Sequence, residues 1–362
     1  MIIQNKYDNI TKSDTRAIKA TIPIFLALCL SCTPVASAEP QITTVTVGNI
    51  PYGIAYDSGK GEIFVTNADS NTVSVISDNN ETVLATVGVG TNPHGIAYDQ
   101  EKAKVYVANL LSNTVSVISD RNNAVVDTID VGTGPHDLAY DSKRGEVFVA
   151  NEKSKTISVI SDRTDAIVAT ISLDSYPFDL AYDPQMDEIF VTSSDSTTSI
   201  ISDKTDAVIS TIHAGGYPFN IAYDPQTDDM FVTGTNSTVL VISDGTNKVV
   251  ATVQMRNNPY YIASGPDGEM LVTEYNSNTI PVISDKSYTV VETIGVGKIP
   301  FGIVCDFQKG EAFVTIHNSN TVSVFYLSSS VPEFPFAIPI LLIAITSLLF
   351  YGGQFCKRID KL

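Results

Sequence analysis

The sequence predicts an all-β fold, a seven-bladed β-propeller of four-stranded blades. Seven prolines recur at the same place in a repeated segment, with steps of 42, 42, 42, 41, 41 and 41 residues: Pro51, Pro93, Pro135, Pro177, Pro218, Pro259 and Pro300. Each copy contains four short apolar, β-branched runs separated by Gly, Asn, Asp and Ser, which is typical of strands and turns. A period near 42 residues with four strands per copy indicates propeller blades.

The second copy shows how each blade is expected to be built. Its first strand is HGIAYD after Pro93, its second holds VYVAN, its third holds TVSVIS, and a VVDTI run supplies the fourth. The aspartate that ends the first strand, Asp99 here, precedes a turn, where its side chain can satisfy backbone N–H groups. Variation in length between copies falls where strands end, as a propeller tolerates.

The two ends of the repeat region complement each other. Residues Gln41 to Gly48 (QITTVTVG) match the fourth run of a copy, but no earlier runs precede them. The seventh copy supplies three runs and then stops. We therefore expect the N-terminal strand to complete the last blade, which closes the ring and hides the sheet edges of an open array.

The termini predict export and membrane anchoring. A basic stretch is followed by apolar residues Ala20 to Leu30 and by Ala36-Ser37-Ala38, which is typical of a signal peptide cut near Ala38. Residues 334–351 carry no charge and precede Lys357, Arg358 and Lys361, as a transmembrane helix with a basic inner flank would. The expected organisation is a signal peptide (1–38), the propeller (39–330), a short linker (331–335), the helix (334–351) and a cytoplasmic tail (352–362).

Composition narrows the classes of function. The formal net charge is −18, and it is −21 once the +2 of residues 1–38 and the +1 of residues 331–362 are removed, so nucleic acid is not expected as a partner. Cys305 is the one cysteine of the repeats and replaces a tyrosine of other copies, which favours a place in the core. The chain has no tryptophan, and it shows no nucleophile elbow, zinc-type cysteine cluster or phosphate-binding glycine loop. An enzyme is therefore the less favoured class.

The candidate site lies at the mouth of the central channel. The innermost strand of each blade begins there, so the residues after each proline should form a ring: Tyr52, His94, His136, Phe178, Phe219, Tyr260 and Phe301. The next positions add Asp137, Asp179 and Asn220 as polar groups. One hypothesis is that His94, His136, Asp137 and Asp179 bind a divalent metal, the one cofactor considered, or a small polar ligand. The alternative, which is favoured, is that the rings plug the mouth and the imidazoles are satisfied by backbone.

Two further sites are predicted from a local pattern. Asn80 and Asn236 begin N-x-Ser/Thr triplets in loops between strands, which makes them candidate glycosylation sites.

The runs IFVTN, VYVAN and VFVAN, each followed by TVSVISD or TISVISD, resemble the YVTN-type β-propeller repeats of secreted and surface-layer proteins, many of them archaeal. Later copies depart from that pattern, with Ser193, Gly234, Glu274 and Ile316 in place of asparagine. The segment PEFPF before the apolar residues and the basic tail is similar to PEF-type archaeal sorting tails. The resemblance implies seven blades and an extracellular location, but it implies no single activity.

These observations predict a membrane-anchored propeller on the cell surface that acts as a non-enzymatic binding or structural module. Its partner would be an envelope or extracellular protein or glycan. The alternative function is a metal-dependent, lactonase-like hydrolase or a metal-binding protein with its site at the channel mouth, because some lactonases resemble these repeats in fold.

Overall fold

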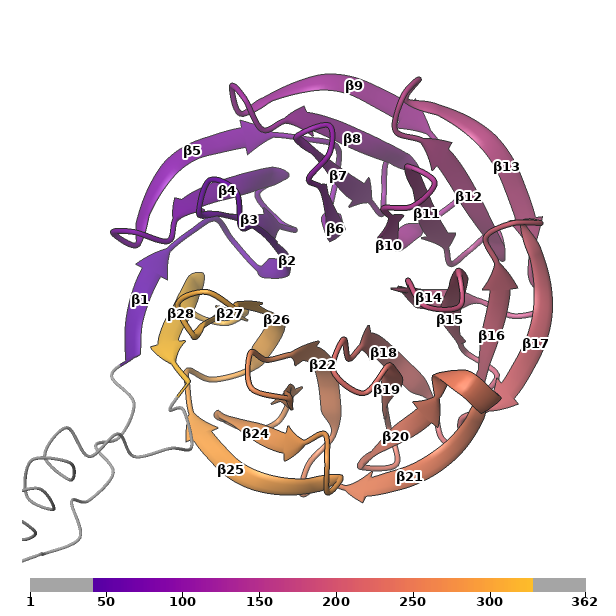
Figure 1. The fold of residues 1–362 in the computed structure, drawn as a ribbon. Helices are drawn as coiled ribbons and strands as arrows, with labels where there is room; N and C mark the ends of the chain where they lie inside the picture. Colours follow the sequence, from indigo (N-terminus) through magenta and orange to yellow (C-terminus); the bar gives the residue numbers. More distant parts are fainter. Residues whose placement is uncertain (1–41, 328–362) are drawn as a thin grey trace, which may run out of the picture. The chain divides into compact units, whose positions relative to one another are not determined.

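The computed structural model describes residues 42–327, which form seven antiparallel four-stranded sheets arranged as a ring (Figure 1). The predicted all-β, seven-bladed propeller is confirmed. The predicted signal peptide, the transmembrane helix at 334–351, the linker and the tail lie outside the described residues. Within 42–327, no helix is both long enough and apolar enough to cross a membrane.

Each blade runs from an inner strand at the channel to an outer strand at the rim. Blades 1 to 3 consist of β2 (Pro51–Asp57), β3 (Glu62–Asn67), β4 (Thr72–Ser77) and β5 (Thr82–Gly88); β6 (Pro93–Asp99), β7 (Lys104–Asn109), β8 (Thr114–Ser119) and β9 (Ala124–Asp130); and β10 (Pro135–Asp141), β11 (Glu146–Asn151), β12 (Thr156–Ser161) and β13 (Ala166–Ser172). Blades 4 and 5 consist of β14 (Pro177–Asp183), β15 (Glu188–Ser193), β16 (Thr197–Ser202) and β17 (Ala207–His213); and β18 (Pro218–Tyr223), β19 (Asp229–Gly234), β20 (Thr238–Ser243) and β21 (Lys248–Gln254). Blade 6 consists of β22 (Pro259–Ser264), β23 (Glu269–Glu274), β24 (Thr279–Ser284) and β25 (Thr289–Gly295), and blade 7 of β26 (Pro300–Asp306), β27 (Glu311–Ile316), β28 (Thr321–Tyr326) and β1 (Ile42–Thr46).

The core lies between blades rather than inside any one of them. The second and third strands of a blade are buried on both faces, whereas the outer strand is mostly exposed. One apolar cluster joins Phe148 and Ile157 of blade 3 to Ile189 and Val191 of blade 4. Each blade therefore covers the apolar face of its neighbour, and a single blade could not bury its own surface.

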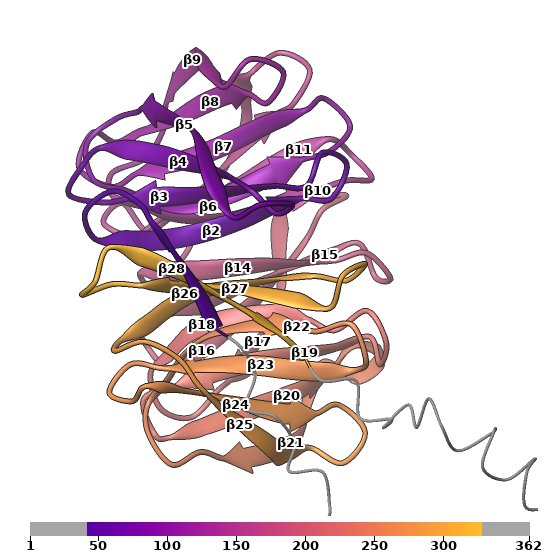
Figure 2. The same cartoon turned by 90° about the vertical axis from the view of Figure 1, so that its left-hand side faces the viewer.

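The predicted ring closure is confirmed. Strand β1 lies beside β28 (Figures 1 and 2) and pairs with it in antiparallel orientation. Val45 lies opposite Val322 in this pair. Val45 is buried and packs in a cluster that contains Ile63 of blade 1 and Phe313 of blade 7. The first and last parts of the propeller are thus held together by both hydrogen bonds and apolar contact.

Two local predictions are also confirmed. Asp57, which ends β2, accepts the backbone N–H of Gly59 at 2.8 Å through Oδ1, so this aspartate does satisfy its turn. Cys305 is 3% exposed and packs in the apolar cluster between blades 6 and 7. Burial raises the pKa of its thiol, as expected for a core cysteine.

Candidate binding site at the channel mouth

The residues after each proline are turned toward the channel by a repeated irregularity of the inner strand. Pro51 lies opposite Asn67 and Ile54 lies opposite Val65, so two residues of β2 face a single residue of β3. The same register shift occurs between the first two strands of all seven blades. Such a bulge bends the strand and redirects side chains. The two residues that follow each proline, which differ between copies, are therefore presented at the mouth.

A threonine of the second strand fixes this bulge in most blades. Thr66 accepts the N–H of Gly53 at 2.8 Å and donates its hydroxyl to the carbonyl oxygen of His94, in the next blade, at 2.7 Å. Equivalent threonines stand in blades 4, 5, 6 and 7. Blades 2 and 3, which carry the two histidines, have Ala108 and Ala150 instead. The threonine thus connects adjacent inner strands around most of the channel.

The structure brings the seven predicted ring residues together around the axis. Tyr52 stacks on His94 with ring centroids 3.9 Å apart and contacts Phe301 at 4.4 Å. His94 and His136 lie 5.2 Å apart, His136 and Phe178 lie 5.8 Å apart, and Phe219 and Tyr260 lie 4.7 Å apart. The mouth is therefore narrowed by contacts between aromatic rings, while the role of these residues in ligand binding stays a prediction.

Other residues contact this ring as well, among them Tyr275, whose side chain lies 5.7 Å from that of Tyr260. Tyr217 lies between Phe178 and Phe219, at 5.3 and 5.8 Å from their rings. Tyr261 contacts both Tyr52 and Phe301. His317, which follows the second strand of blade 7, also joins the ring, because its imidazole packs 5.0 Å from Phe301.

Both ring histidines are neutral at physiological pH. His136 has a carbonyl oxygen, that of Phe178, 3.1 Å from Nδ1, so Nδ1 carries the proton and Nε2 accepts from the Tyr52 hydroxyl at 3.4 Å. Burial lowers the pKa of His136 to about 4. Burial, with His136 and His317 nearby, lowers the pKa of His94 to about 3. The circle of seven side chains at the mouth therefore includes no charged imidazolium group.

Next to this circle of aromatic side chains, buried polar side chains form hydrogen bonds from one blade to the next. Asp179 accepts N–H groups from Leu180 at 2.9 Å through Oδ1 and from Ile221 at 2.8 Å through Oδ2, and the Asn220 amide also donates to Oδ2. Asn220 in turn accepts the N–H of Ile262 of blade 6 at 2.9 Å. Both carboxylate oxygens of Asp179 are thus engaged within the protein.

Asp137 lies next to Asp179 and shares its environment. Asp137 accepts the N–H of Leu138 at 2.8 Å, and its carboxyl lies above Gly95, where a Cβ atom would fall 2.5 Å from the Asp137 Cα. Burial raises the pKa of Asp137 to about 6. Burial and the charge of Asp137 raise the pKa of Asp179 well above its usual range. Because two adjacent buried carboxyls resist joint ionisation, this pair holds a proton near neutral pH.

These groups line a small cavity at the mouth. Its volume is about 60 Å³, which corresponds to about two water molecules. The lining residues are Tyr52, His136, Asp137, Phe178, Asp179, Phe219, Asn220, Tyr260 and Tyr261. A second cavity of about 50 Å³ also reaches Asp137 and Tyr261 and is bounded by Gly53, Gly95 and Gly302. Asp137 therefore lies on both cavities, and no lysine or arginine lines either of them.

The predicted metal ligands do not form a coordination sphere. Among residues 42–327, no group of three or more His, Cys, Asp or Glu side chains is arranged to hold a metal ion. His136 and Asp179 use their polar atoms in internal hydrogen bonds, and His94 stacks on Tyr52. The geometry gives the metal prediction at this mouth no support.

The two predicted glycosylation sites lie on exposed turns. Asn80 accepts the Thr82 hydroxyl at 2.7 Å, and Asn236 accepts the Thr238 hydroxyl at 2.6 Å. Modification of either side chain stays a prediction.

The fold and this site define a seven-bladed β-propeller with an aromatic, acidic cavity at one mouth of its channel. No protein-family model matches the chain, and no curated protein sequence matches it. Among solved structures, the chain is similar to hydrazine synthase of Kuenenia stuttgartiensis, with 18% sequence identity and a TM-score of 0.71 over 82% of this chain and 99% of that chain. At this identity the likeness shows the fold alone. The YVTN-type repeat and the PEF-type tail stay predictions.

Proposed function

We propose that the protein is a non-enzymatic binding module of the cell envelope, and that its channel mouth receives a small protonated amine, free or carried by a partner molecule. The observation that carries this proposal is the cavity of about 60 Å³, walled by aromatic rings and floored by Asp137 and Asp179. Aromatic faces and carboxylates are the groups that attract ammonium ions. The lining residues include no cation of their own, so an ammonium ligand would supply the missing charge.

The size and charge state of the site set the kind of amine. A volume of about two water molecules admits an ammonium or methylammonium group but not a bulky quaternary one. Binding a cation would favour the ionised form of the carboxyl pair and release the proton it holds. Affinity should therefore rise with pH through the range in which Asp137 titrates, whose pKa burial raises to about 6.

Calorimetric titration of the full-length protein with methylammonium chloride tests the proposal, with tetramethylammonium chloride as the size control at equal ionic strength. We expect saturable binding of methylammonium alone and at least a tenfold loss of affinity in Asp137→Asn. The matched control Asp174→Asn, an exposed aspartate outside the site, should bind as the wild type does. Absence of saturable methylammonium binding, or unchanged binding in Asp137→Asn, would overturn the proposal.

A lactone-hydrolysis assay separates this function from the hydrolase alternative. Reproducible turnover that disappears in Asp137→Asn and persists in Asp174→Asn would contradict a non-enzymatic role. His136 has no free lone pair to act as a general base, because Nδ1 donates to the carbonyl oxygen of Phe178 and Nε2 accepts from the Tyr52 hydroxyl, which favours binding over catalysis.

The envelope location rests on the sequence of the two ends. The export signal at 1–38 and the apolar residues 334–351 with their basic flank support a propeller held on the outer face of the membrane. The protein should then sediment with the membrane fraction of lysed cells. Protease added to intact cells should digest the propeller. Replacing residues 334–351 by a Gly/Ser linker should release it into the medium. A protease-resistant protein in the soluble cell fraction would contradict this location.

A further inference from the structure

A pair of buried aspartates recurs at six interfaces between blades. One aspartate ends the inner strand of a blade, and the other lies in the turn after the third strand of the next blade. The pairs are Asp57 with Asp120, Asp99 with Asp162, Asp141 with Asp203, Asp183 with Asp244, Asp224 with Asp285, and Asp306 with Asp78. Two buried carboxyls at one place are costly unless a positive group or a proton accompanies them.

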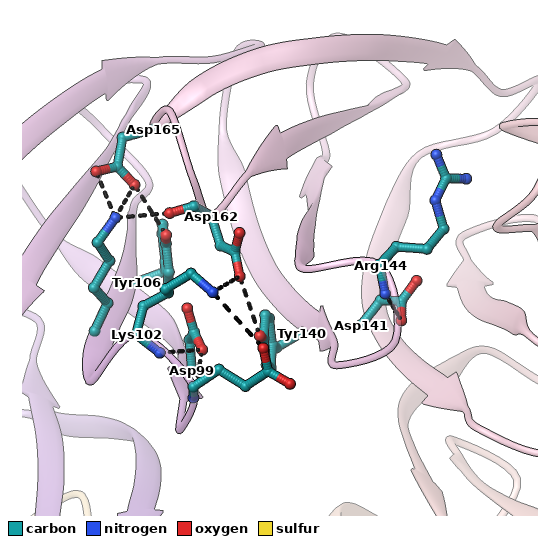
Figure 3. Close-up of polar contacts among 10 residues, drawn as sticks. Asp99, Lys102, Tyr106, Tyr140, Asp141, Arg144, Asp162 and Asp165 are labelled. Atoms are coloured by element: carbon teal, nitrogen blue, oxygen red, sulfur yellow. Dashed lines mark hydrogen bonds and ion pairs between the residues drawn. The ribbon is translucent and has the colours of Figure 1, made fainter.

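At four of these interfaces the sequence supplies the positive group three residues after the first aspartate. Lys60 Nζ lies 2.8 Å from Asp120 Oδ1, Lys309 Nζ lies 2.9 Å from Asp78 Oδ1, and Lys102 Nζ lies 3.6 Å from Asp162 Oδ2. Figure 3 shows Lys102 reaching across from the turn of Asp99 to Asp162. Arg144 holds the same position after Asp141, but its guanidinium pairs with Glu146 at 3.1 Å and with Asp206 at 3.9 Å and acts on Asp203 through its nearby charge alone.

At two of these interfaces the lysine also donates to the backbone carbonyl oxygen of the turn aspartate. Lys309 Nζ donates to the backbone carbonyl oxygen of Asp78 at 3.1 Å, and Lys60 Nζ donates to that of Asp120. A tyrosine of the blade that carries the turn aspartate also donates a hydrogen bond to that aspartate. Tyr98 donates to Asp120 and Tyr140 donates to Asp162, both at 3.3 Å. The ammonium group thus occupies a position defined by carboxylate and carbonyl oxygens.

The interface between blades 4 and 5 has the aspartates without these partners. Met186 stands three residues after Asp183, where four of the other five interfaces have lysine or arginine. Tyr223 of blade 5 donates to Asp228 instead of to Asp244. Asp183 is 0% exposed and Asp244 is 8% exposed, and Asp183 Oδ2 and Asp244 Oδ1 have no hydrogen-bond partner among the described residues. Asp141 Oδ2 and Asp203 Oδ1 also lack one between blades 3 and 4, but there the charge of Arg144 acts on Asp203.

The surroundings of this pair are negative. Burial, followed by the hydrogen-bonded Asp183, raises the pKa of Asp244 to about 7, and Asp228 and Glu188 add to the effect. No lysine or arginine within residues 42–327 forms an ion pair with Asp183 or Asp244. The interface between blades 5 and 6, which also lacks the cation, differs because Thr227 donates its hydroxyl to Asp224 Oδ2 at 2.7 Å.

We propose that Asp183 and Asp244 bind one calcium ion between blades 4 and 5, at the position that the lysine ammonium group occupies in the equivalent interfaces. The ligands would be one oxygen of each carboxylate and the carbonyl oxygen of Asp244, with water completing the shell. All are hard oxygen donors, which suit calcium, and calcium tolerates irregular coordination better than magnesium does. The ion would join two blades, so its role is to stabilise the ring.

The test measures calcium uptake and thermal stability of the full-length protein at low ionic strength, with calcium chloride or EDTA. We expect one calcium bound per chain and a melting temperature several degrees higher with calcium than with EDTA. Asp244→Asn should bind no calcium and lose the shift. The matched control Asp162→Asn, at the interface that Lys102 occupies, should keep both.

Met186→Lys is the decisive variant because it introduces the lysine that three of the other interfaces have at this position. It should melt in EDTA at least as high as the calcium-loaded wild type does, and calcium should no longer change its melting temperature. This variant also covers the case in which Asp244→Asn fails to fold. Wild-type protein that takes up no calcium, or a Met186→Lys protein that still takes up one equivalent, would overturn the proposal. In the first case the two aspartates share a proton instead.

Discussion

The carboxylate of Asp179, in blade 4, accepts the backbone N–H of Ile221, in blade 5, at 2.8 Å. This bond links the inner strands of adjacent blades at the depth of the cavity floor. The Asn220 side chain repeats the arrangement one blade further on, through Ile262. The same residues that form the acidic floor of the cavity therefore also hold neighbouring blades in register, and altering the floor should alter stability.

Replacing Asp179 by alanine should lower the free energy of unfolding by about 2 to 4 kcal/mol, because it leaves the buried N–H groups of Leu180 and Ile221 without acceptors. Asp179→Asn keeps one oxygen acceptor and should cost less. Urea unfolding followed by circular dichroism measures both, with Asp174→Ala as the exposed control. Equal midpoints for Asp179→Ala and Asp174→Ala would show that the bond between blades contributes nothing.

The pH dependence of stability should reveal the charge state of Asp137. Its pKa is raised to about 6 from 3.8, so the folded state prefers the neutral carboxyl. Such a group contributes stability that is fully present below pH 3.8 and is lost as the pH rises through 6. From pH 4 to pH 7, Asp137→Asn should therefore gain on the wild type by about 2 kcal/mol, because 1.36 kcal/mol is lost per unit of pKa and part of the loss has already occurred by pH 4.

The histidines act in the opposite direction over part of this range. The pKa of His94 is lowered to about 3 from 6.5, so its contribution is complete above pH 6.5 and is lost as the pH falls toward 3. The quantity to measure is therefore the difference between variant and wild type at each pH, in which the histidine contribution cancels. A difference that stays constant from pH 4 to pH 7 would mean that Asp137 titrates normally in the folded protein.

The repeat period and the complementary ends of the chain were sufficient to predict the number of blades, the four strands of each and the closing strand. The ring of residues after the prolines was also predictable, because a propeller places the start of every inner strand at one mouth. Pairing the strands in detail would have located His317 as well. Pro300 lies opposite Ile316, so the residue after Ile316 must lie beside the mouth.

The hydrogen bonds of the floor could not be predicted in the same way. They depend on the bulge after each proline and on how far one blade is rotated against the next, and neither is encoded in a single copy of the repeat. The pairing of the aspartates at the blade interfaces could not be predicted either. They were recognised as turn residues, but their partners lie in the turn of the following blade, which the sequence places about 60 residues away.

The closing strand provides the last prediction. Val45 is 5% exposed and packs between blades 7 and 1, whereas its neighbour Thr44 is exposed on the same strand. Val45→Asp places an unpaired charge in that contact and should release β1 from β28. The freed edge of β28 would then offer unpaired backbone groups to other molecules, which favours aggregation.

Size-exclusion chromatography and thermal melting check this expectation, with Thr44→Asp as the matched control. Val45→Asp, like deletion of residues 41–48, should appear in aggregates and melt at a lower temperature, while Thr44→Asp should stay monodisperse at the wild-type elution volume. A Val45→Asp protein that elutes and melts as the control does would mean that the first strand is dispensable. The ring would then be held by the contact between β2 and β26, which pack side by side without the closing strand.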